Sequence, residues 1–279
     1  MTRIITHAVA KVNLMLNIIG KTADGYHEIE SVFVFLPDIF DVLEFDTERE
    51  FDETAGNIPE VPACDNSIKK AAKILRNNFN EPLPHVSLNK SLPIAGGVGG
   101  GSSDAACFVN TIFDIWGFAQ DEKLKYLDAF TELGTDARIF LFKYFTNSDA
   151  LYFCGGLKGI TKPIDLGLNN CYVLLVNNGS KISTKLVYEK FKEPFLNKIG
   201  SENINFDLLK NFSNSLQNAA VSLENSLKQI LCDIESTKPI FCGVSGSGTT
   251  CFGFYDNFEI LKSAANALNY KFVKTTGLA

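Results

Sequence analysis

The feature that most constrains this chain is a glycine-rich loop near its middle. Five of the six residues from Gly96 to Gly101 are glycine, and Ser102 and Ser103 follow directly. Glycine lets the backbone approach a ligand closely, and the amides at a helix N-terminus form an anion site. Because a strand pattern precedes the loop and a helix pattern follows it, we interpret it as a phosphate-binding loop rather than a flexible linker. The predicted nucleotide-binding residues are Pro93, Ile94, Ala95, Gly96, Gly97, Val98, Gly99, Gly100, Gly101, Ser102 and Ser103.

The loop differs from two better-known phosphate loops. It contains neither G-x-x-x-x-G-K-[ST] nor a Rossmann G-x-G-x-x-G that closes a first strand. We expect a helix over Ser102–Trp116, with Ser102 or Ser103 near its cap and Gly117 just past its end. Asp104 would repel a phosphate if it faced the loop, so we expect its side chain to point aside.

Composition narrows the class of protein. The 279 residues suit about two domains. A balance of 26 basic to 32 acidic residues lacks the basic footprint of nucleic-acid binding, which is therefore not expected. The seven cysteines form no C-x-x-C pair, and neither a signal peptide nor an apolar run of membrane-spanning length is evident. We expect a cytoplasmic protein without membrane contact, either a monomer or a weak homodimer.

The order of elements favours an α+β fold. The first ninety residues have mainly strand patterns, interrupted by an amphipathic helix at Asn66–Phe79. Later segments alternate irregularly between helix and strand, and one long helix is expected over Asn214–Ile234. This irregularity argues against a doubly wound sheet. A polar stretch at Thr146–Asp149 predicts a boundary between domains 1–148 and 149–279.

Three segments together resemble the signatures of the GHMP kinase superfamily. They are Ala10–Leu14 (AKVNL), the loop Pro93–Ala106, and Val244–Phe252 (VSGSGTTCF), in that order along the chain. The segment Ala23–Glu28 (ADGYHE) is more selective and looks like the signature of the 4-diphosphocytidyl-2-C-methyl-D-erythritol kinase family. The resemblance covers the whole chain.

The resemblance implies a fold and an activity. It implies an N-terminal domain like ribosomal protein S5 domain 2 and a C-terminal ferredoxin-like domain. It also implies phosphorylation by ATP, with Mg²⁺, of the 2-hydroxyl of 4-diphosphocytidyl-2-C-methyl-D-erythritol, an intermediate of non-mevalonate isoprenoid synthesis. Transfer is expected to be direct and in line. No protein ligand of the metal is assigned.

Two residues are the candidate catalytic pair. Lys11 lies in an otherwise apolar strand, where a lone lysine ordinarily faces solvent, and the resemblance makes it the active-site lysine. Asp136 would by default start a helix, and the pattern Gly134-Thr135-Asp136 makes it the catalytic aspartate that accepts or orients the hydroxyl proton. The next residues, Ala137 and Arg138, depart from the family's usual Val-Pro.

The remaining candidates are predicted to bind substrate. Tyr26 and His27 are expected to hold the cytosine by stacking and by recognition of the base edge, with Tyr188 as the second aromatic. The other candidates are Asn13, which shares a strand face with Lys11, together with Thr184, Ser245 and Gly246. The turn Ser245–Gly248 could otherwise be a plain hairpin.

Two departures and two alternatives remain. Val9 replaces a common proline, and the family's Asn-Asp-Leu-Glu stretch is matched only by Asn218–Val221. The chain could instead be another GHMP kinase, acting on homoserine, mevalonate or a sugar, although such relatives are not expected to carry DGYHE. A non-catalytic nucleotide-binding protein is the other alternative, against which the presence of both Lys11 and Asp136 argues.

Overall fold

The computed structural model describes residues 3–23, 25–58, 60–148, 151–155, 160–168, 170–212 and 214–278. Asp24 of the selective signature and Asp149 of the predicted boundary lie outside these residues. The chain divides into two compact units. The first comprises Met1–Ala10, Phe40–Leu92 and Gly99–Ser148, and the second comprises Lys11–Ile39, Pro93–Val98 and Asp149–Ala279. Each unit is therefore made of several separate segments of the chain. The domain boundary at 148/149 stays a prediction.

Two long strands account for this alternation. β1 (Arg3–Lys21) and β2 (His27–Glu50) are neighbours in one sheet, and each contributes residues to both units. In the first unit, the later half of β2 pairs antiparallel with β3 (Pro84–Asn89). In the second, Glu30–Phe33 of β2 pairs with β4 (Leu151–Gly155), and β4 pairs with β5 (Ile160–Ile164). A hairpin of β-branched and aromatic residues suits such extended strands.

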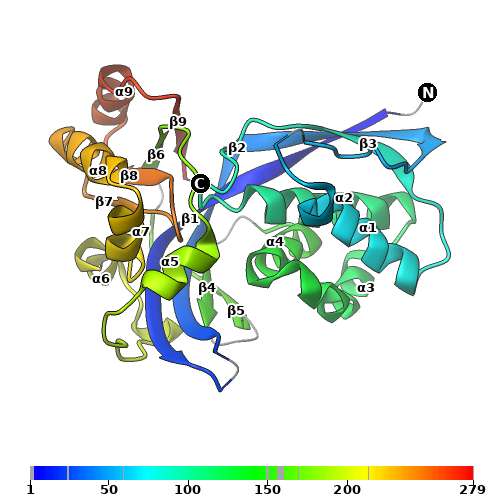
Figure 1. Ribbon diagram of the computed structural model, residues 1–279, viewed down its shortest axis with the longest axis horizontal. Helices are drawn as coiled ribbons and strands as arrows, with labels where there is room; N and C mark the ends of the chain where they lie inside the picture. Colours follow the sequence, from blue (N-terminus) through cyan, green and yellow to red (C-terminus); the bar gives the residue numbers. More distant parts are fainter. Residues whose placement is uncertain are drawn as a thin grey trace. The chain divides into compact units, whose positions relative to one another are not determined.

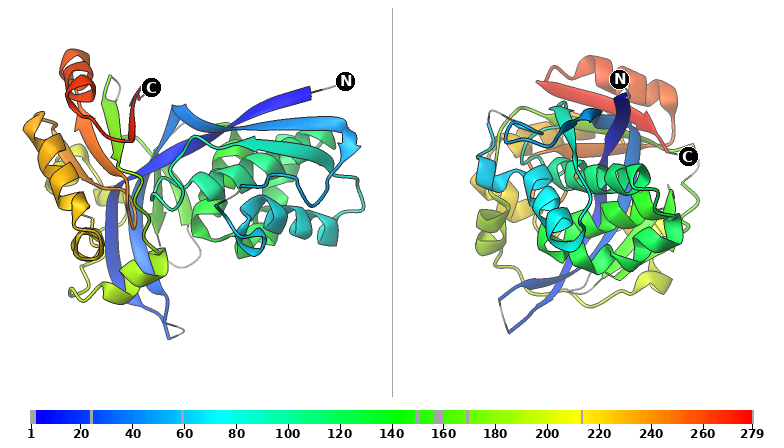
Figure 2. Two further views of the ribbon diagram at one scale, coloured as in Figure 1. Left: turned by 45° about the horizontal axis from the view of Figure 1, so that its top comes forward. Right: turned by 90° about the vertical axis from the view of Figure 1, so that its right-hand side faces the viewer.

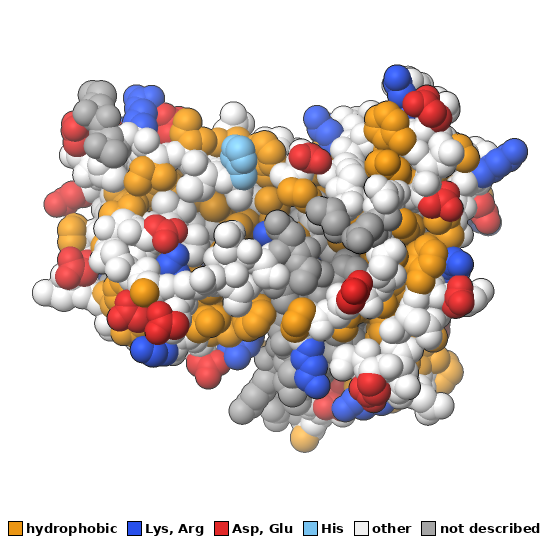
Figure 3. Space-filling model, turned by 180° about the vertical axis from the view of Figure 1, so that it is seen from behind, with side chains coloured by type: hydrophobic (Ala, Val, Ile, Leu, Met, Phe, Trp, Pro, Cys, Tyr) orange, Lys and Arg blue, Asp and Glu red, His pale blue; other side chains and the backbone are white. Residues whose placement is uncertain are grey.

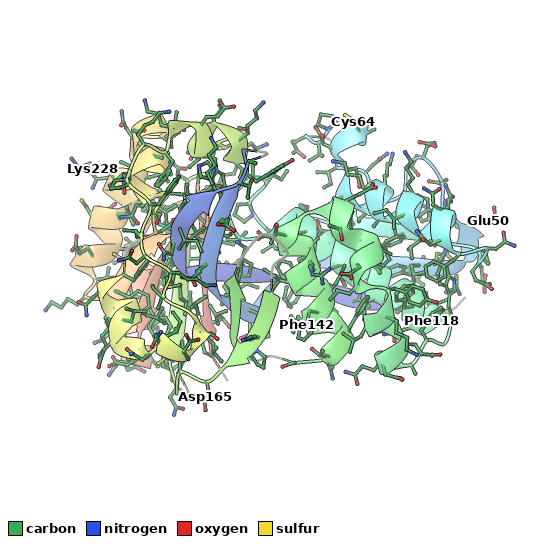
Figure 4. All side chains as sticks on the ribbon, turned by 90° about the horizontal axis from the view of Figure 1, so that it is seen from below. Glu50, Cys64, Phe118, Phe142, Asp165 and Lys228 are labelled. Carbon is green, nitrogen blue, oxygen red and sulfur yellow. The ribbon has the colours of Figure 1, made fainter. Side chains whose placement is uncertain are left out.

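Helices complete the first unit and cover one face of its strands (Figure 1). They are α1 (Ser67–Asn78), α2 (Gly100–Ile115), α3 (Gln120–Lys125) and α4 (Thr135–Thr146), with two 3-10 segments at Ala63–Asp65 and Leu127–Leu133. Their core is aromatic: the Phe113 ring stacks on Phe118 at 4.8 Å and packs edge-on against Phe130. Phe118 is labelled in Figure 4. Phe113 lies near the end of α2, and the beginnings of α2 and α4 carry candidate site residues.

A four-stranded antiparallel sheet builds the rest of the second unit. Its order is β7–β8–β6–β9, formed by β6 (Tyr172–Asn177), β7 (Phe241–Val244), β8 (Cys251–Tyr255) and β9 (Phe272–Gly277). The helices are α5 (Thr184–Lys190), α6 (Phe206–Asn211), α7 (Gln217–Leu223), α8 (Ser226–Ser236) and α9 (Phe258–Ala267), with a 3-10 turn at Ser201–Asn203. In Figure 2, α8 and α9 lie on one face of this sheet. Buried side chains of both layers, such as Leu174, Ile230 and Leu261, form its core.

Two expectations about helices were wrong. The helix expected over Asn214–Ile234 is interrupted, because Glu224 adopts an extended conformation and its carboxylate accepts the amide and hydroxyl of Ser226. That local hydrogen bonding ends α7 and starts α8. The helix expected from Ser102 begins at Gly100, with Gly99 as the cap. Gly117 lies just past the end, as expected.

Charged side chains of both signs are interspersed on the face drawn in Figure 3, so that face carries no large field of one sign. Among the helices that the structure describes, none is long and apolar enough to cross a bilayer.

Candidate active site

The first half of the glycine loop is held by the turn between β7 and β8. The Gly96 carbonyl accepts the Thr250 amide at 2.9 Å, and the Gly97 carbonyl accepts the Ser245 hydroxyl at 2.9 Å. The Val98 carbonyl accepts the Lys11 amide at 3.0 Å. All these residues belong to the second unit, so three of its segments, far apart in sequence, converge on Pro93–Val98.

Gly97 shows why this loop needs glycine. Its φ is +77°, and a Cβ there would lie 2.1 Å from the Ser245 carbonyl oxygen. A side chain is therefore excluded both by backbone conformation and by contact. The loop and the Ser245 turn touch backbone to backbone, which ties the candidate nucleotide residues to the candidate substrate residues Ser245 and Gly246.

The second half of the loop starts α2 in the first unit. Gly99 has φ +72° and is the N-cap residue of the helix, and among the described residues no side-chain cap hydrogen bond is present there. The first-turn amides can donate to an anion, and the helix dipole favours negative charge there. A phosphate group therefore fits this N-terminus. Ser103 is turned inward, where its hydroxyl lies 3.0 Å from the phenol oxygen of Tyr144 on α4.

A buried charge cluster lies beside the start of α2. The Lys90 ammonium donates to Asp104 at 2.7 Å and to Asp41, and both carboxylates are fully buried. Asp41 also accepts the amides of Ser91 and Leu92, the residues that lead into the loop. The Asp104 side chain is thus turned to Lys90, as expected for a residue that does not face a phosphate. Sequence reasoning did not find Asp41 or Lys90 as part of this site.

Burial is the largest influence on the pKa values of Asp104 and Lys90 in this cluster. Burial raises the pKa of Asp104 to about 7, Lys90 opposes this rise, and Asp41 adds to it. Burial also disfavours the charged form of Lys90, but Asp104 and Asp41 outweigh it and raise the pKa of Lys90. One Asp104 oxygen, Oδ1, has no hydrogen-bond partner among the described residues.

Lys11 and Asn13 form one hydrogen-bonded set in β1. Lys11 is 3% exposed, and its ammonium lies 2.5 Å from Asn13 Oδ1 and over the Phe33 ring at 5.1 Å. Asn13 Nδ2 donates to the Ser31 hydroxyl at 2.8 Å. A Cβ on Gly246 would lie 3.1 Å from Asn13 Oδ1 and 3.5 Å from Lys11 Nζ. Lys11, Asn13, Ser245 and Gly246 are therefore neighbours, and the Asn13 amide orients the lysine.

Asp136 is the second residue of α4 and half-buried. It belongs to the first unit and Lys11 to the second, so their pairing stays a prediction. Arg138, whose purpose the sequence left open, forms an ion pair with Asp128. It therefore fastens the beginning of α4 to the preceding 3-10 segment.

The candidate base-binding residues lie beside α5 in the second unit. The His27 ring stacks on Tyr188, with 5.1 Å between ring centroids and 30° between planes. Phe191 and Phe195 stand edge-on to the same imidazole at 5.9 and 6.5 Å. Tyr26 is 72% exposed, which leaves its ring available for stacking. Burial, followed by the charge of Lys21, lowers the pKa of His27.

The turn at Ser245–Gly248 is held from two further sides. The Thr184 hydroxyl lies 2.9 Å from that of Ser247. Asn214 donates to the carbonyls of Val244 and Gly246 at 2.8 and 2.6 Å, and Gln217 accepts the Val244 amide. Asn214-Ser215-Leu216-Gln217 is therefore a better match to the family's Asn-Asp-Leu-Glu than Asn218–Val221. The spacing of this segment could have identified the match in the sequence: it has Asn-x-Leu, and a residue with a side-chain carbonyl, Gln217, stands three positions after Asn214.

No group of three or more His, Cys, Asp or Glu side chains gathers into a metal site within the described parts of the chain. Mg²⁺ commonly keeps several waters and binds through one or two carboxylates together with substrate phosphates. The residues present fit a metal that arrives with a nucleotide rather than one held by a protein cage.

Comparison with known proteins places this geometry in a family. The family model for the GHMP kinases N terminal domain matches residues 66–142. A curated 4-diphosphocytidyl-2-C-methyl-D-erythritol kinase from Thermoanaerobacter pseudethanolicus is 31% identical over 98% of this chain and 95% of the relative. One from Prochlorococcus marinus is 30% identical over 95% of this chain and 90% of the relative.

A solved structure agrees at the level of the fold. The crystal structure of a 4-(cytidine 5'-diphospho)-2C-methyl-D-erythritol kinase matches with a TM-score of 0.78 at 24% identity, covering 98% of this chain and 99% of that one. The mixed helix-and-sheet fold expected from the sequence is thereby confirmed. Identity of 31% over nearly full length, together with this fold, shows that the chain belongs to the 4-diphosphocytidyl-2-C-methyl-D-erythritol kinase family of the GHMP kinases.

Proposed function

We propose that this protein transfers the γ-phosphate of ATP to the 2-hydroxyl of 4-diphosphocytidyl-2-C-methyl-D-erythritol, in the cytoplasm, as a step of non-mevalonate isoprenoid synthesis. The observation that carries the proposal is the set of Lys11, Asn13, Ser245 and Gly246 packed on the glycine loop. It places a buried cation next to backbone that a phosphate can approach. Full-length similarity to kinases of that name supports the substrate.

The phosphates of ATP bind Pro93–Ser103, where the start of α2, whose cap residue is a glycine, supplies amides and the positive end of the helix dipole. The hydroxyl oxygen of the acceptor forms a bond to the γ-phosphorus as the bond to the β–γ bridging oxygen breaks. Asp136 takes the hydroxyl proton. Lys11 stabilises the negative charge on the transferring group, and a preorganised cation of this kind lowers the barrier without reorganisation.

Mg²⁺ bound with the nucleotide would neutralise part of the phosphate charge. Tyr26, His27 and Tyr188 hold the cytosine. The hydrogen bond between Thr184 and Ser247 fixes the Ser245–Gly248 turn. These groups position the substrate for direct transfer. The reaction therefore needs no covalent enzyme intermediate.

The variant Asp136→Asn tests the assignment of the base. The amide keeps the size of the side chain but cannot take a proton, so we expect kcat to fall by roughly 10²–10⁴ while ADP binding, measured by calorimetry, is unchanged. As a matched control, Asp128→Asn removes only the partner of Arg138 and is expected to retain activity. A near-normal kcat for Asp136→Asn would remove it as the base.

A further inference from the structure

The segment that follows α5 has no helix or strand, yet five hydrogen bonds anchor it. The Leu196 amide donates to the Ile18 carbonyl at 3.0 Å, and the Asn197 carbonyl accepts from Asn17 at 3.1 Å, both on β1. Glu193 accepts from Asn218 on α7 at 2.8 Å. The amides of Ile199 and Gly200 donate to Glu30. This loop, residues 193–200, is therefore fixed to the β1–β2 hairpin at one end and to α7 at the other.

Glu30 is the main anchor of this loop. Its carboxylate is fully buried in β2 and accepts the Ile199 amide at 2.7 Å and the Gly200 amide at 3.0 Å. Two amides directed at one carboxylate satisfy a charge that burial would otherwise disfavour strongly. Such a buried acceptor fixes the path of the loop and thereby the position of Phe195.

Phe195 is half-exposed, and its buried edge faces His27. Its ring stands at 72° to the imidazole with 6.5 Å between centroids, and lies nearly parallel to Phe191. His27 thus has Tyr188 on its face and two phenylalanines at its edges. In Figure 1, α5 lies beside the β1–β2 hairpin that carries His27.

We propose that the 193–200 loop is a wall of the nucleobase site and that Phe195 acts through His27, as a positioning residue that orients the imidazole and keeps it out of water. The inference rests on the proposed function, since it concerns the pyrimidine half of that substrate. A neutral imidazole offers one N–H donor and one bare nitrogen acceptor. The bare nitrogen can accept a hydrogen bond from the amino group of a cytosine edge, whereas an imidazolium offers only donors.

The charges around His27 favour the neutral ring. Burial lowers the pKa of His27, and Lys21 at the end of β1 lowers it further. Among the described ring contacts of His27, α5 presents the Tyr188 phenol and the loop presents the hydrocarbon ring of Phe195. The charged residues of the loop itself are Glu193 and Lys198. Phe195→Ala admits water to one edge of the imidazole and is expected to raise the pKa of His27 toward the ordinary 6.5.

The test combines an NMR titration with kinetics on the full chain. The chain has three histidines, so His7 and His85 serve as internal references. In Phe195→Ala we expect the His27 titration to move upward and KM for the cytidyl substrate to rise about 5–10-fold, most strongly at acidic pH, with kcat and KM for ATP unchanged. Phe195→Tyr should restore both. Phe258→Ala, a half-exposed ring against Tyr172 in the same unit, should change neither.

Failure of this inference is separable from failure of the proposed function. Unchanged His27 titration and unchanged KM in Phe195→Ala would overturn the inference, even with an active wild-type enzyme. A wild-type enzyme inactive on the cytidyl substrate would overturn the proposed function, and the titration, which needs no substrate, would still report on Phe195 and His27. Glu30→Gln, which weakens the anchor without touching either ring, is expected to shift the titration in the same direction as Phe195→Ala. No shift in this variant would contradict the role of the loop.

Discussion

Single side chains in this molecule are constrained chiefly by burial. Lys90, Asp41 and Asp104 are charged groups in an interior that tolerates charge only when it is paired. Two carboxylates share one ammonium, so the cluster holds more negative than positive charge. Burial is the main reason why the pKa of Asp104 rises to about 7 although a lysine is bonded to it, and the second carboxylate, Asp41, adds to the rise.

Stability should therefore depend on pH through Asp104. The unfolded chain releases this proton near 3.8 and the folded chain near 7, so the unfolded state ionises first as pH rises. The contribution of Asp104 to stability is complete below pH 3.8 and is lost as pH rises toward 7. Asp104→Asn stays neutral, and we expect it to raise the free energy of unfolding at about pH 8 by on the order of 2 kcal/mol. Urea unfolding at about pH 5 and 8 measures this, and an unaltered pH dependence would contradict it.

Removing the shared cation should have the opposite effect. Lys90→Met leaves two buried carboxylates without a cation, and breaking a buried pair in this way costs about 3–5 kcal/mol. Lys123→Met is the matched control, because the Lys123 side chain is even more buried than that of Lys90 (7% against 13% exposed) but its partner Asp114 is 57% exposed. Exposed pairs contribute about 0–1 kcal/mol. Thermal unfolding compares the two variants. Equal losses would show that Lys90 does not hold the cluster together.

Among the elements, the glycine loop matters most to the candidate site, because its two halves make different contacts. Pro93–Val98 touches the Ser245 turn backbone to backbone, and Gly99–Ser103 opens α2. The sequence predicted the loop, the strand before it and the helix after it. It placed the cap at Ser102 or Ser103, since serine ordinarily caps by its side chain. Here a left-handed glycine does so and the first-turn amides stay available.

Replacement of Gly97 tests this contact. In Gly97→Ala the new Cβ would lie 2.1 Å from the Ser245 oxygen in a backbone conformation that costs roughly 1–2 kcal/mol for alanine. The loop must shift, so we expect KM for ATP to rise about tenfold and the melting temperature to fall. Gly277→Ala is the control, because its Cβ would lie 3.7 Å from the Tyr172 ring, in ordinary van der Waals contact. If Gly97→Ala binds ATP as the wild type does, the close approach has no role in the site.

Sequence reasoning named motif residues but not the residues that support them. Lys11, Asp136, Tyr26 and His27 lie in short motifs that resemble the family's, and their roles stay predictions. Glu30, Tyr144 and Gln217 were not named, since their importance lies in backbone groups that only folding brings near. The break between α7 and α8 was missed for the same reason: it depends on one Glu224 side chain bonded to Ser226.

At the scale of the whole molecule, the units do not follow the order of the chain. β1 and β2 each supply residues to both, so Lys11 belongs with residues 149–279 although it stands near the N-terminus. Periodicity along the sequence reports local structure and says nothing of such long-range grouping, and the boundary at 148/149 stays a prediction. The same grouping brings Lys11, Ser245 and Tyr188 into one unit.

The most direct test of the account is the choice of acceptor. ADP release with ATP and Mg²⁺ should be measured for 4-diphosphocytidyl-2-C-methyl-D-erythritol, homoserine and mevalonate, and kcat/KM compared. Because buried polar groups that bind a base edge reject ligands lacking it, we expect the cytidyl substrate to be preferred by about 10⁴-fold or more. Comparable or greater turnover with homoserine or mevalonate would contradict the account.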